Sequence, residues 1–150
     1  MQTSEEHLYN VDINWKSGRV GSMSSPGLEE KLDVATPPEF PGGVEGVWSP
    51  EHLFVASVSS CFMTSFTAIA EYSKFEFESL NVKSSGVMSR EDGKFVMSKV
   101  ILKPLLEITD GKYEKKAYRL LEKAEEICLI SRSIKSEIEF QPEVRVLISE

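Results

Sequence analysis

Two cysteines are the residues of this sequence best suited to chemistry, because a cysteine thiolate is a strong nucleophile and is readily oxidised. Cys61 lies in the middle of a run without a charge, from Leu53 to Ala70. Cys128 follows a stretch in which apolar residues recur every three or four positions. The residues alone leave two interpretations open. The two cysteines are either a reactive pair or two buried residues acting as small apolar side chains. The periodicity by itself favours the second interpretation.

Composition and charge narrow the functional classes. The chain has 150 residues, a net charge of −7 and a pI near 5.0, with 41% hydrophobic and 27% charged residues. This length predicts a single domain over residues 1–150. A negative net charge disfavours nucleic-acid binding and attachment to an anionic membrane. Only two histidines, His7 and His52, are present and no C-x-x-C motif occurs, so no metal site or other cofactor is expected.

The first residues predict where the protein works. They include two early glutamates and no apolar stretch of the kind found in a signal peptide, so we expect a cytoplasmic protein. In a reducing compartment, cysteines are more often free or catalytic than joined in a structural disulfide.

The run around Cys61 predicts a long helix. Ser49 is a good helix cap, Pro50 fits the first helical position, and Glu51 suits the positive end of the helix dipole. The helix is expected to end near Tyr72, where charged residues return. A membrane span is disfavoured by the many serines and threonines. A helix that is uncharged all round and rich in small residues is instead typical of the centre of a globule, where a second helix, from this chain or another, can approach closely.

The rest of the chain predicts an α+β domain. A loop is expected over 36–46, and turns over 16–21, 24–27 and 90–94. Pro104 predicts a bend, a bulge or an edge position in its strand. The remaining elements are strands at 7–15, at a short segment before 24 and at 30–35, a hairpin of 79–89 and 94–108, a helix at 111–134, and one or two strands over 136–149 around Pro142.

The second helix carries a regular apolar stripe that ends at Cys128. If this stripe packs against the central helix, Cys61 and Cys128 meet in the core. The opposite face is rich in lysine and glutamate, which predicts a face exposed to solvent. On this face we expect Glu114, Glu122 and Glu125 to pair with lysines. The stripe consists of Tyr113, Ala117, Leu120, Leu121, Ala124, Ile127 and Cys128.

Several segments together resemble the OsmC/Ohr family, the osmotically inducible protein C and organic hydroperoxide resistance proteins. The stretch "WSPEHLFVASVSSCF" is similar to the region around the family's reactive cysteine, and "AEEICLISRSI" to the region around its second cysteine. Upstream, "SGRVG" and "LDVATPPEFPGG" resemble the N-terminal hairpin and the glycine-rich approach. The order is the same over nearly the whole chain. Leu129 stands where the family usually has proline, and His52 where the Ohr branch has glutamine, which favours an OsmC-like branch.

The resemblance implies a fold and a set of roles. It implies an intertwined homodimer and a metal-free thiol peroxidase that protects against oxidative stress. Cys61 would be oxidised by an organic hydroperoxide to a sulfenic acid, and Cys128 would resolve it as a disulfide. Arg19 would hold Cys61 as a thiolate and polarise the peroxide, and Glu51 would pair with Arg19. The disulfide would be reduced by a dithiol donor, with a lipoylated protein as one candidate.

Physical chemistry fits these roles and adds a geometric expectation. A guanidinium stays charged and lowers the pKa of a neighbouring thiol, and it needs a carboxylate partner against an apolar site. Glu51 and Cys61 are ten residues apart on one helix, which separates them by roughly 15 Å along its axis. They can therefore share a site only across two subunits, with the sites at the subunit interface of a two-fold dimer.

Apolar neighbours of the cysteines are candidates for a substrate pocket, although each of them could equally be plain core. An alternative function stays open, in which an OsmC-fold protein binds a small apolar molecule in a cavity between subunits without catalysis. The candidate pocket residues are Phe54, Phe62, Met63, Phe66 and Leu129.

Overall fold

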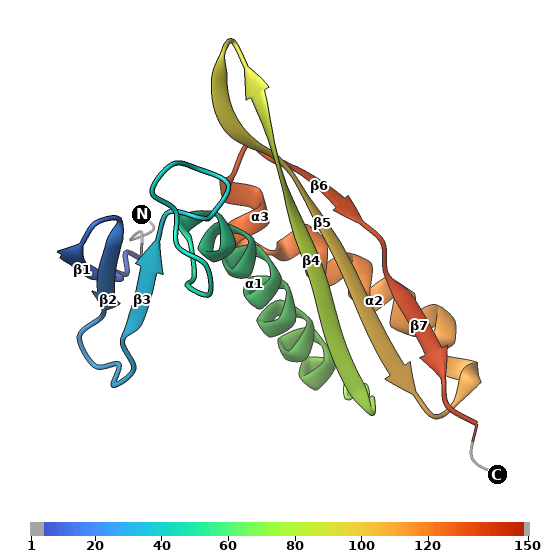
Figure 1. Ribbon diagram of the computed structural model, residues 1–150. Helices are drawn as coiled ribbons and strands as arrows, with labels where there is room; N and C mark the ends of the chain where they lie inside the picture. The colour runs from blue at the N-terminus through green and yellow to red at the C-terminus, as the bar shows by residue number, and fades with distance from the viewer. Residues whose placement is uncertain (1–4, 149–150) are drawn as a thin grey trace. The chain divides into compact units, whose positions relative to one another are not determined.

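The computed structural model describes residues 5–148, which form two compact units that divide between Leu53 and Phe54. Helix α1 (Pro50–Tyr72) begins at the end of the first unit and continues into the second. The α+β class and the expected order of strands and helices are confirmed (Figure 1).

The N-terminal unit is a three-stranded antiparallel sheet followed by a loop. Its strands are β1 (Asp12–Ser17), β2 (Val20–Ser24) and β3 (Leu32–Ala35), in the order β1-β2-β3. The first strand begins later than the predicted 7–15, so residues 7–11 are not part of the sheet. Large apolar side chains on β1 are exposed, including Ile13 at 59% and Trp15 at 76%. The sheet therefore lacks a core of its own.

The predicted start of α1 is confirmed in atomic detail. Ser49 is fully buried, and its Oγ accepts a hydrogen bond from the backbone N–H of His52 at 3.1 Å. The backbone N–H of Ser49 donates in return to His52 Nδ1 at 3.3 Å. This reciprocal arrangement is a capping box in which histidine takes the place of the usual glutamate. It satisfies helix-terminal N–H groups and fixes where α1 begins.

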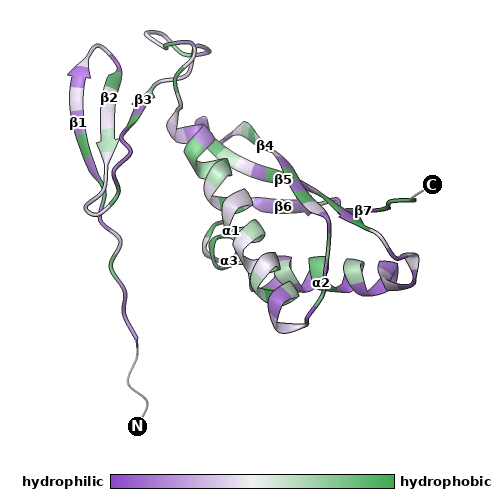
Figure 2. Ribbon diagram, turned by 90° about the horizontal axis from the view of Figure 1, so that it is seen from below, coloured by the Kyte–Doolittle hydropathy of each residue, from purple (hydrophilic) through white to green (hydrophobic). Residues whose placement is uncertain are grey.

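The C-terminal unit is a four-stranded sheet with helices on one face (Figures 1 and 2). Strands β4 (Ser79–Glu91) and β5 (Lys94–Ile108) form the predicted hairpin, closed by Asp92 and Gly93 with φ of 51° and 78°. Two positive φ values at an Asp-Gly pair are typical of the type I′ turn. Strands β6 (Glu137–Phe140) and β7 (Glu143–Val146) pair with β5 in parallel, and residue 149 of the predicted C-terminal strands lies outside the described residues.

One continuous core joins the helices of this unit to the sheet. Phe62 and Phe66 of α1 are fully buried, and so are Leu102 and Leu106 of β5 and Leu121 of α2 (Glu114–Ile127). Each such side chain contributes roughly 1.5–3 kcal/mol on burial. The C-terminal unit therefore has the apolar core that the N-terminal sheet lacks.

A glycine allows α1 to approach the sheet closely. A Cβ at Gly86 of β4 would lie 2.5 Å from a methyl carbon of Val55. A larger residue at this position would require the side chains of Val55 and of Met97, which would lie 2.6 Å away, to move.

Pro104 occupies a central position rather than an edge. It lies in β5, which has β4 on one side and β6 and β7 on the other, and it pairs with Val82 without a bulge. The carbonyl of Leu102, two residues earlier, accepts a hydrogen bond from the N–H of Gln141. Because every second residue of a strand directs its backbone groups to the same side, the backbone groups of Leu102 and Pro104 both face β6 and β7. The missing N–H of Pro104 therefore points to the break between these two strands. The predicted edge position or bulge is wrong because the neighbouring strand is interrupted instead, and the predicted bend stays a prediction.

The predicted helix over 111–134 is wrong in one respect: it is not continuous. A short 3-10 turn (Gly111–Tyr113) precedes α2, and a second helix, α3 (Leu129–Ser133), follows it. Cys128 separates α2 from α3 with an extended backbone, φ −60° and ψ 112°. Cys128 is thus a junction residue rather than a residue within a helix.

Candidate active site

The structure brings the two cysteines together. Cys61 on α1 is partly exposed, whereas Cys128 is fully buried, and both are free thiols. Each thiol shifts the pKa of the other, so the two side chains are near neighbours. The Cys128 Sγ also lies 4.0 Å from the carbonyl oxygen of Val58, one turn before Cys61 on α1. Two neighbouring thiols of this kind can be oxidised to a disulfide.

The surroundings of Cys61 favour its thiolate. Burial raises the pKa of the Cys61 thiol, but hydrogen bonds from the Ile130 N–H, the Cys128 thiol, the Ser65 hydroxyl and the Leu129 N–H together outweigh burial. The pKa of Cys61 is therefore lowered from its ordinary value. The two backbone donors exist because α3 begins at Leu129, which leaves its first N–H groups without partners inside the helix. The break at Cys128 thus creates donors for Cys61.

The surroundings of Cys128 have the opposite effect. Burial raises the pKa of the Cys128 thiol, and hydrogen bonding and charge from Cys61 raise it further. The side chain and backbone of Ser131 lower it, but not enough to compensate. The two thiols therefore differ in acidity: the partly exposed one ionises first, and the buried one retains its proton.

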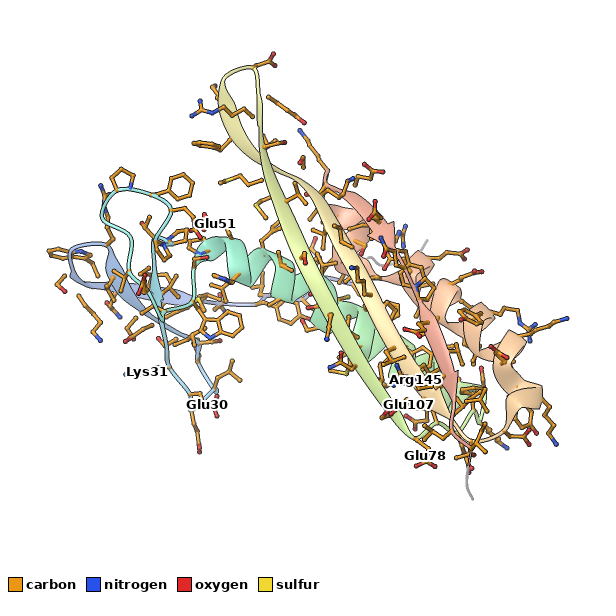
Figure 3. The ribbon with its side chains drawn as sticks, turned by 45° about the vertical axis from the view of Figure 1, so that its right-hand side comes forward. Glu30, Lys31, Glu51, Glu78, Glu107 and Arg145 are labelled. Atoms are coloured by element: carbon orange, nitrogen blue, oxygen red, sulfur yellow. The ribbon has the colours of Figure 1, made fainter. Side chains whose placement is uncertain are left out.

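Arg19 and Glu51, the other two predicted catalytic residues, both belong to the N-terminal unit. Arg19 is exposed in the turn between β1 and β2, and its side chain lies across Gly42, where a Cβ would approach it to 3.1 Å. Glu51 stands in the first turn of α1 (Figure 3), and its Oε2 is buried without a hydrogen-bond partner among the described residues. The two side chains form no ion pair with each other in the described chain.

The predicted pocket residues differ in their burial. Phe62 and Phe66 are fully buried and stack on each other at 6.5 Å between ring centroids, and Phe54 packs against the same core. Met63 and Leu129 are exposed at 41% and 65%. A pocket role for these five residues stays a prediction, and the exposed pair is better placed to meet a substrate than the two core phenylalanines.

Two polar residues beside the cysteines did not emerge from the sequence. Glu125 was predicted on the solvated face of α2 in an ion pair, but it is half-buried and makes no ion pair with any described residue. Ser131 lies on α3 beside both Glu125 and Cys128. The signal that could have revealed Glu125 is its spacing, since it lies four residues after the buried Leu121 and three before Cys128.

Two further findings bear on the class of protein. Within residues 5–148, no group of three or more His, Cys, Asp or Glu side chains is arranged to hold a metal ion. Helix α1 is long and apolar enough to cross a membrane by length and composition, and 28% of its most apolar segment is buried. Core helices of soluble proteins can pass the same test, so this finding is weak support for a membrane span.

An α+β protein with two neighbouring free thiols is the class that fold and site define. Comparison with known proteins gives the family: the sequence pattern of the family described as OsmC-like protein matches residues 43–143. The chain therefore belongs to the OsmC-like family. Its fold also matches that of an organic hydroperoxide resistance protein OsmC from Legionella pneumophila, with a TM-score of 0.74 and 26% identity over 95% of this chain and 100% of that one.

Curated relatives are similar over nearly their whole length. The uncharacterized protein YmaD of Bacillus subtilis (strain 168) is 29% identical over 146 residues, which cover 94% of this chain and 95% of YmaD. A protein of Mycoplasma genitalium named organic hydroperoxide resistance protein-like is 28% identical over 133 residues, covering 87% of this chain and 89% of that protein. The name of the Mycoplasma genitalium protein refers to organic hydroperoxides.

Proposed function

We propose that this protein is a thiol peroxidase that reduces organic hydroperoxides and so protects the cell against oxidative stress. The observation that carries the proposal is the pair of adjacent thiols with opposite shifts in pKa: lowered at the partly exposed Cys61 and raised at the buried Cys128. A peroxidatic thiol must be ionised and reachable, whereas a resolving thiol must stay beside it and react second.

The first step oxidises Cys61. The thiolate sulfur attacks one oxygen of the hydroperoxide, the O–O bond breaks, and the alkoxide takes up a proton and leaves as an alcohol. Cys61 becomes a sulfenic acid, and the peroxide is reduced by two electrons. Met63, two residues after Cys61, and Leu129, directly after Cys128, are exposed apolar side chains, which suit an alkyl chain better than hydrogen peroxide.

The second step returns the site to a stable form. Cys128 attacks the sulfenic sulfur of Cys61, a disulfide forms and water leaves. An external dithiol then reduces the disulfide by exchange and is itself oxidised to a disulfide. A lipoylated protein is a candidate for this reductant, since its dithiol closes into a ring on oxidation.

We further propose that the working unit is a homodimer in which Arg19 and Glu51 complete the site of Cys61. The unpartnered buried oxygen of Glu51 requires a donor, and a guanidinium is well suited to provide it. The exposed apolar residues of β1 and the largely uncovered helix α1 supply apolar surface for a subunit interface. Ten residues separate Glu51 from Cys61 along α1, which favours a site shared between subunits.

A rapid thiol titration with cumene hydroperoxide tests the proposed function. The protein should lose two thiols per chain with formation of a Cys61–Cys128 disulfide, detected by peptide mass spectrometry without reduction. Cys61→Ser should abolish the reaction. Cys128→Ser should stop at a sulfenic acid that dimedone traps.

The alternative function gives a different result in the same titration. If the protein only binds an apolar molecule, its thiols should react with the hydroperoxide no faster than free cysteine. That outcome, obtained with folded dimeric protein, would overturn the peroxidase proposal.

A further inference from the structure

One glycine of the N-terminal unit lies against the side chain of Arg19. A Cβ at Gly42 would lie 3.1 Å from both the Cγ and the Nε of Arg19 and 3.7 Å from its Cδ. The stem of the arginine therefore crosses the bare Cα of the glycine. Because non-bonded carbon atoms prefer separations of about 3.5–4.0 Å, an added Cβ would force these two residues apart.

The pairing of the strands explains why these two residues meet. Val20 of β2 pairs with Ala35 of β3, so the turn that carries Arg19 and the loop that follows Ala35 leave the sheet at the same end. The turn is also fixed from its other side, because the Trp15 Nε1 donates a hydrogen bond to the Gly18 carbonyl at 3.0 Å. The backbone of Arg19 is thus held by the sheet, and its side chain is supported by the loop.

The loop between β3 and α1 (Figure 1) is closed on itself, which makes it a firm support. The Val44 N–H donates a hydrogen bond to the Thr36 carbonyl at 2.9 Å and so joins the two arms of the loop. A Cβ at Gly43 would overlap the Pro37 carbonyl, so the arms are also in contact. Three prolines restrict the backbone further. Since the loop is fixed and the Arg19 side chain is exposed, the arginine is the partner that an added Cβ would move.

We propose that Gly42 is a positioning residue that sets where the guanidinium of Arg19 lies in the reaction of Cys61. This inference rests on the proposed function, in which Arg19 helps to complete the site of Cys61. Gly42 meets two requirements at once: its φ of 81° is in the region that favours glycine, and its missing side chain leaves the space that the arginine stem fills. The contact restricts a long, exposed side chain before the reaction, which reduces the entropy lost when the guanidinium takes its place.

Gly46 offers a matched control in the same unit. It has nearly the same backbone conformation, with φ of 77°, but a Cβ there would meet nothing within 4 Å. Gly42→Ala and Gly46→Ala therefore share the cost of a positive φ, and only the first displaces Arg19. Gly42→Asn and Gly46→Asn form a second pair for the case in which an alanine variant does not fold, since asparagine tolerates a positive φ better than alanine.

The test measures the first chemical step in a Cys128→Ser background. Each variant is mixed with cumene hydroperoxide, and the rate of sulfenic acid formation is followed by the loss of the remaining thiol, with dimedone trapping to identify the product. Gly42→Ala should react roughly 10²-fold more slowly than Gly46→Ala, the loss expected for a group misplaced by about 1 Å. Its alkylation by iodoacetamide should also move to higher pH, because a displaced cation favours the Cys61 thiolate less.

A double-mutant cycle separates this role from a merely structural one. In an Arg19→Ala background, Gly42→Ala and Gly46→Ala should react at equal rates, because the atoms that the Cβ displaces are gone. If Gly42→Ala stays as slow relative to Gly46→Ala without the arginine side chain, the cause lies in the loop itself and the inference is wrong.

The outcomes also distinguish this inference from the proposed function. If the parent protein forms no sulfenic acid, the proposed function fails and the role of Gly42 with it. If Arg19→Ala reacts as fast as the parent protein, the arginine takes no part in the step and the role of Gly42 fails again. If Arg19→Ala is slow but Gly42→Ala matches Gly46→Ala in rate and in alkylation curve, the function stands and the positioning role of Gly42 is wrong.

Discussion

The two units of this chain differ in how far they bury their large apolar side chains. The C-terminal unit buries its phenylalanines and leucines in a continuous core between α1, α2 and the sheet, and both cysteines belong to it. The N-terminal sheet leaves Ile13, Trp15 and Leu28 more than half exposed. The C-terminal unit has a core that can hold the thiol pair, whereas the N-terminal unit leaves apolar side chains exposed to solvent in a single chain. Stability and assembly are therefore expected to depend on different parts of the sequence.

The largest effect should come from the core of the C-terminal unit. Leu121→Ala removes a fully buried side chain and should lower the free energy of unfolding by about 2–5 kcal/mol, through lost burial and the cavity that remains. Urea unfolding followed by circular dichroism measures this. Leu28→Ala is the comparison in the N-terminal unit, where the exposed side chain should contribute about 0.5 kcal/mol or less to the folding of the chain. If both variants lost the same free energy of unfolding, the two units would not differ in their contribution to stability.

The next effect concerns assembly. Trp15→Ser removes the most exposed aromatic side chain of β1 and should weaken the proposed dimer about 30-fold, which corresponds to about 2 kcal/mol for a central interface residue. Sedimentation equilibrium over a range of concentrations measures the dissociation constant. Asn14→Ala, at the neighbouring position of the same strand, is the matched control. A wild-type protein that stays monomeric at high concentration would contradict the dimer itself.

A smaller effect is expected where the two units are joined. Ser49→Ala removes the buried cap of α1 and should lower the free energy of unfolding by about 1 kcal/mol, because the His52 N–H and ring nitrogen lose a partner. Ser49→Thr keeps the hydroxyl and should retain most of the stability. If Ser49→Ala unfolds like the wild type, the start of α1 does not depend on this cap.

The smallest effect tests whether the acidity of Cys61 comes from its own unit. The hydroxyl of Ser65 lowers the pKa of Cys61, so Ser65→Ala should raise that pKa and move the alkylation rate of Cys61 to higher pH. The pKa rises because the Ser65 hydroxyl donates a hydrogen bond that stabilises the thiolate. Since only the thiolate is alkylated, a higher pKa moves the reaction to higher pH. Iodoacetamide alkylation from pH 5 to 10 in a Cys128→Ser background measures the curve. Ser60→Ala, an exposed hydroxyl on the same helix, should leave it unchanged.

Much of the fold was predictable from local patterns. Ser49 and Pro50 marked the start of α1, and Asp92 and Gly93 marked the β4–β5 turn, because cap and turn chemistry depend on neighbours in sequence. The position of Pro104 was not predictable, because it depends on a break between β6 and β7 some 40 residues away. A missing N–H can be accommodated by the partner strand as well as by the strand that carries it.

The site was predictable in part. The apolar stripe correctly indicated that Cys128 meets Cys61, since periodicity reports which face of a helix is buried. It could not report the change of ψ at Cys128 that ends α2, because Leu129 continues the helical pattern where a proline would have interrupted it. The backbone donors of Leu129 and Ile130 depend on that single dihedral angle.

The distance between the cysteines along the chain affects the last stage of the proposed cycle. A disulfide from Cys61 to Cys128 closes a loop of about 67 residues and restricts the entropy of the unfolded chain, which stabilises the oxidised fold by about 4 kcal/mol in the entropic model. By thermodynamic linkage, the same energy lowers the reduction potential of the bond, by on the order of 90 mV. The fold that makes the disulfide easy to form thus makes it hard to reduce. This favours a dithiol, whose own ring closure drives the exchange, over a single thiol.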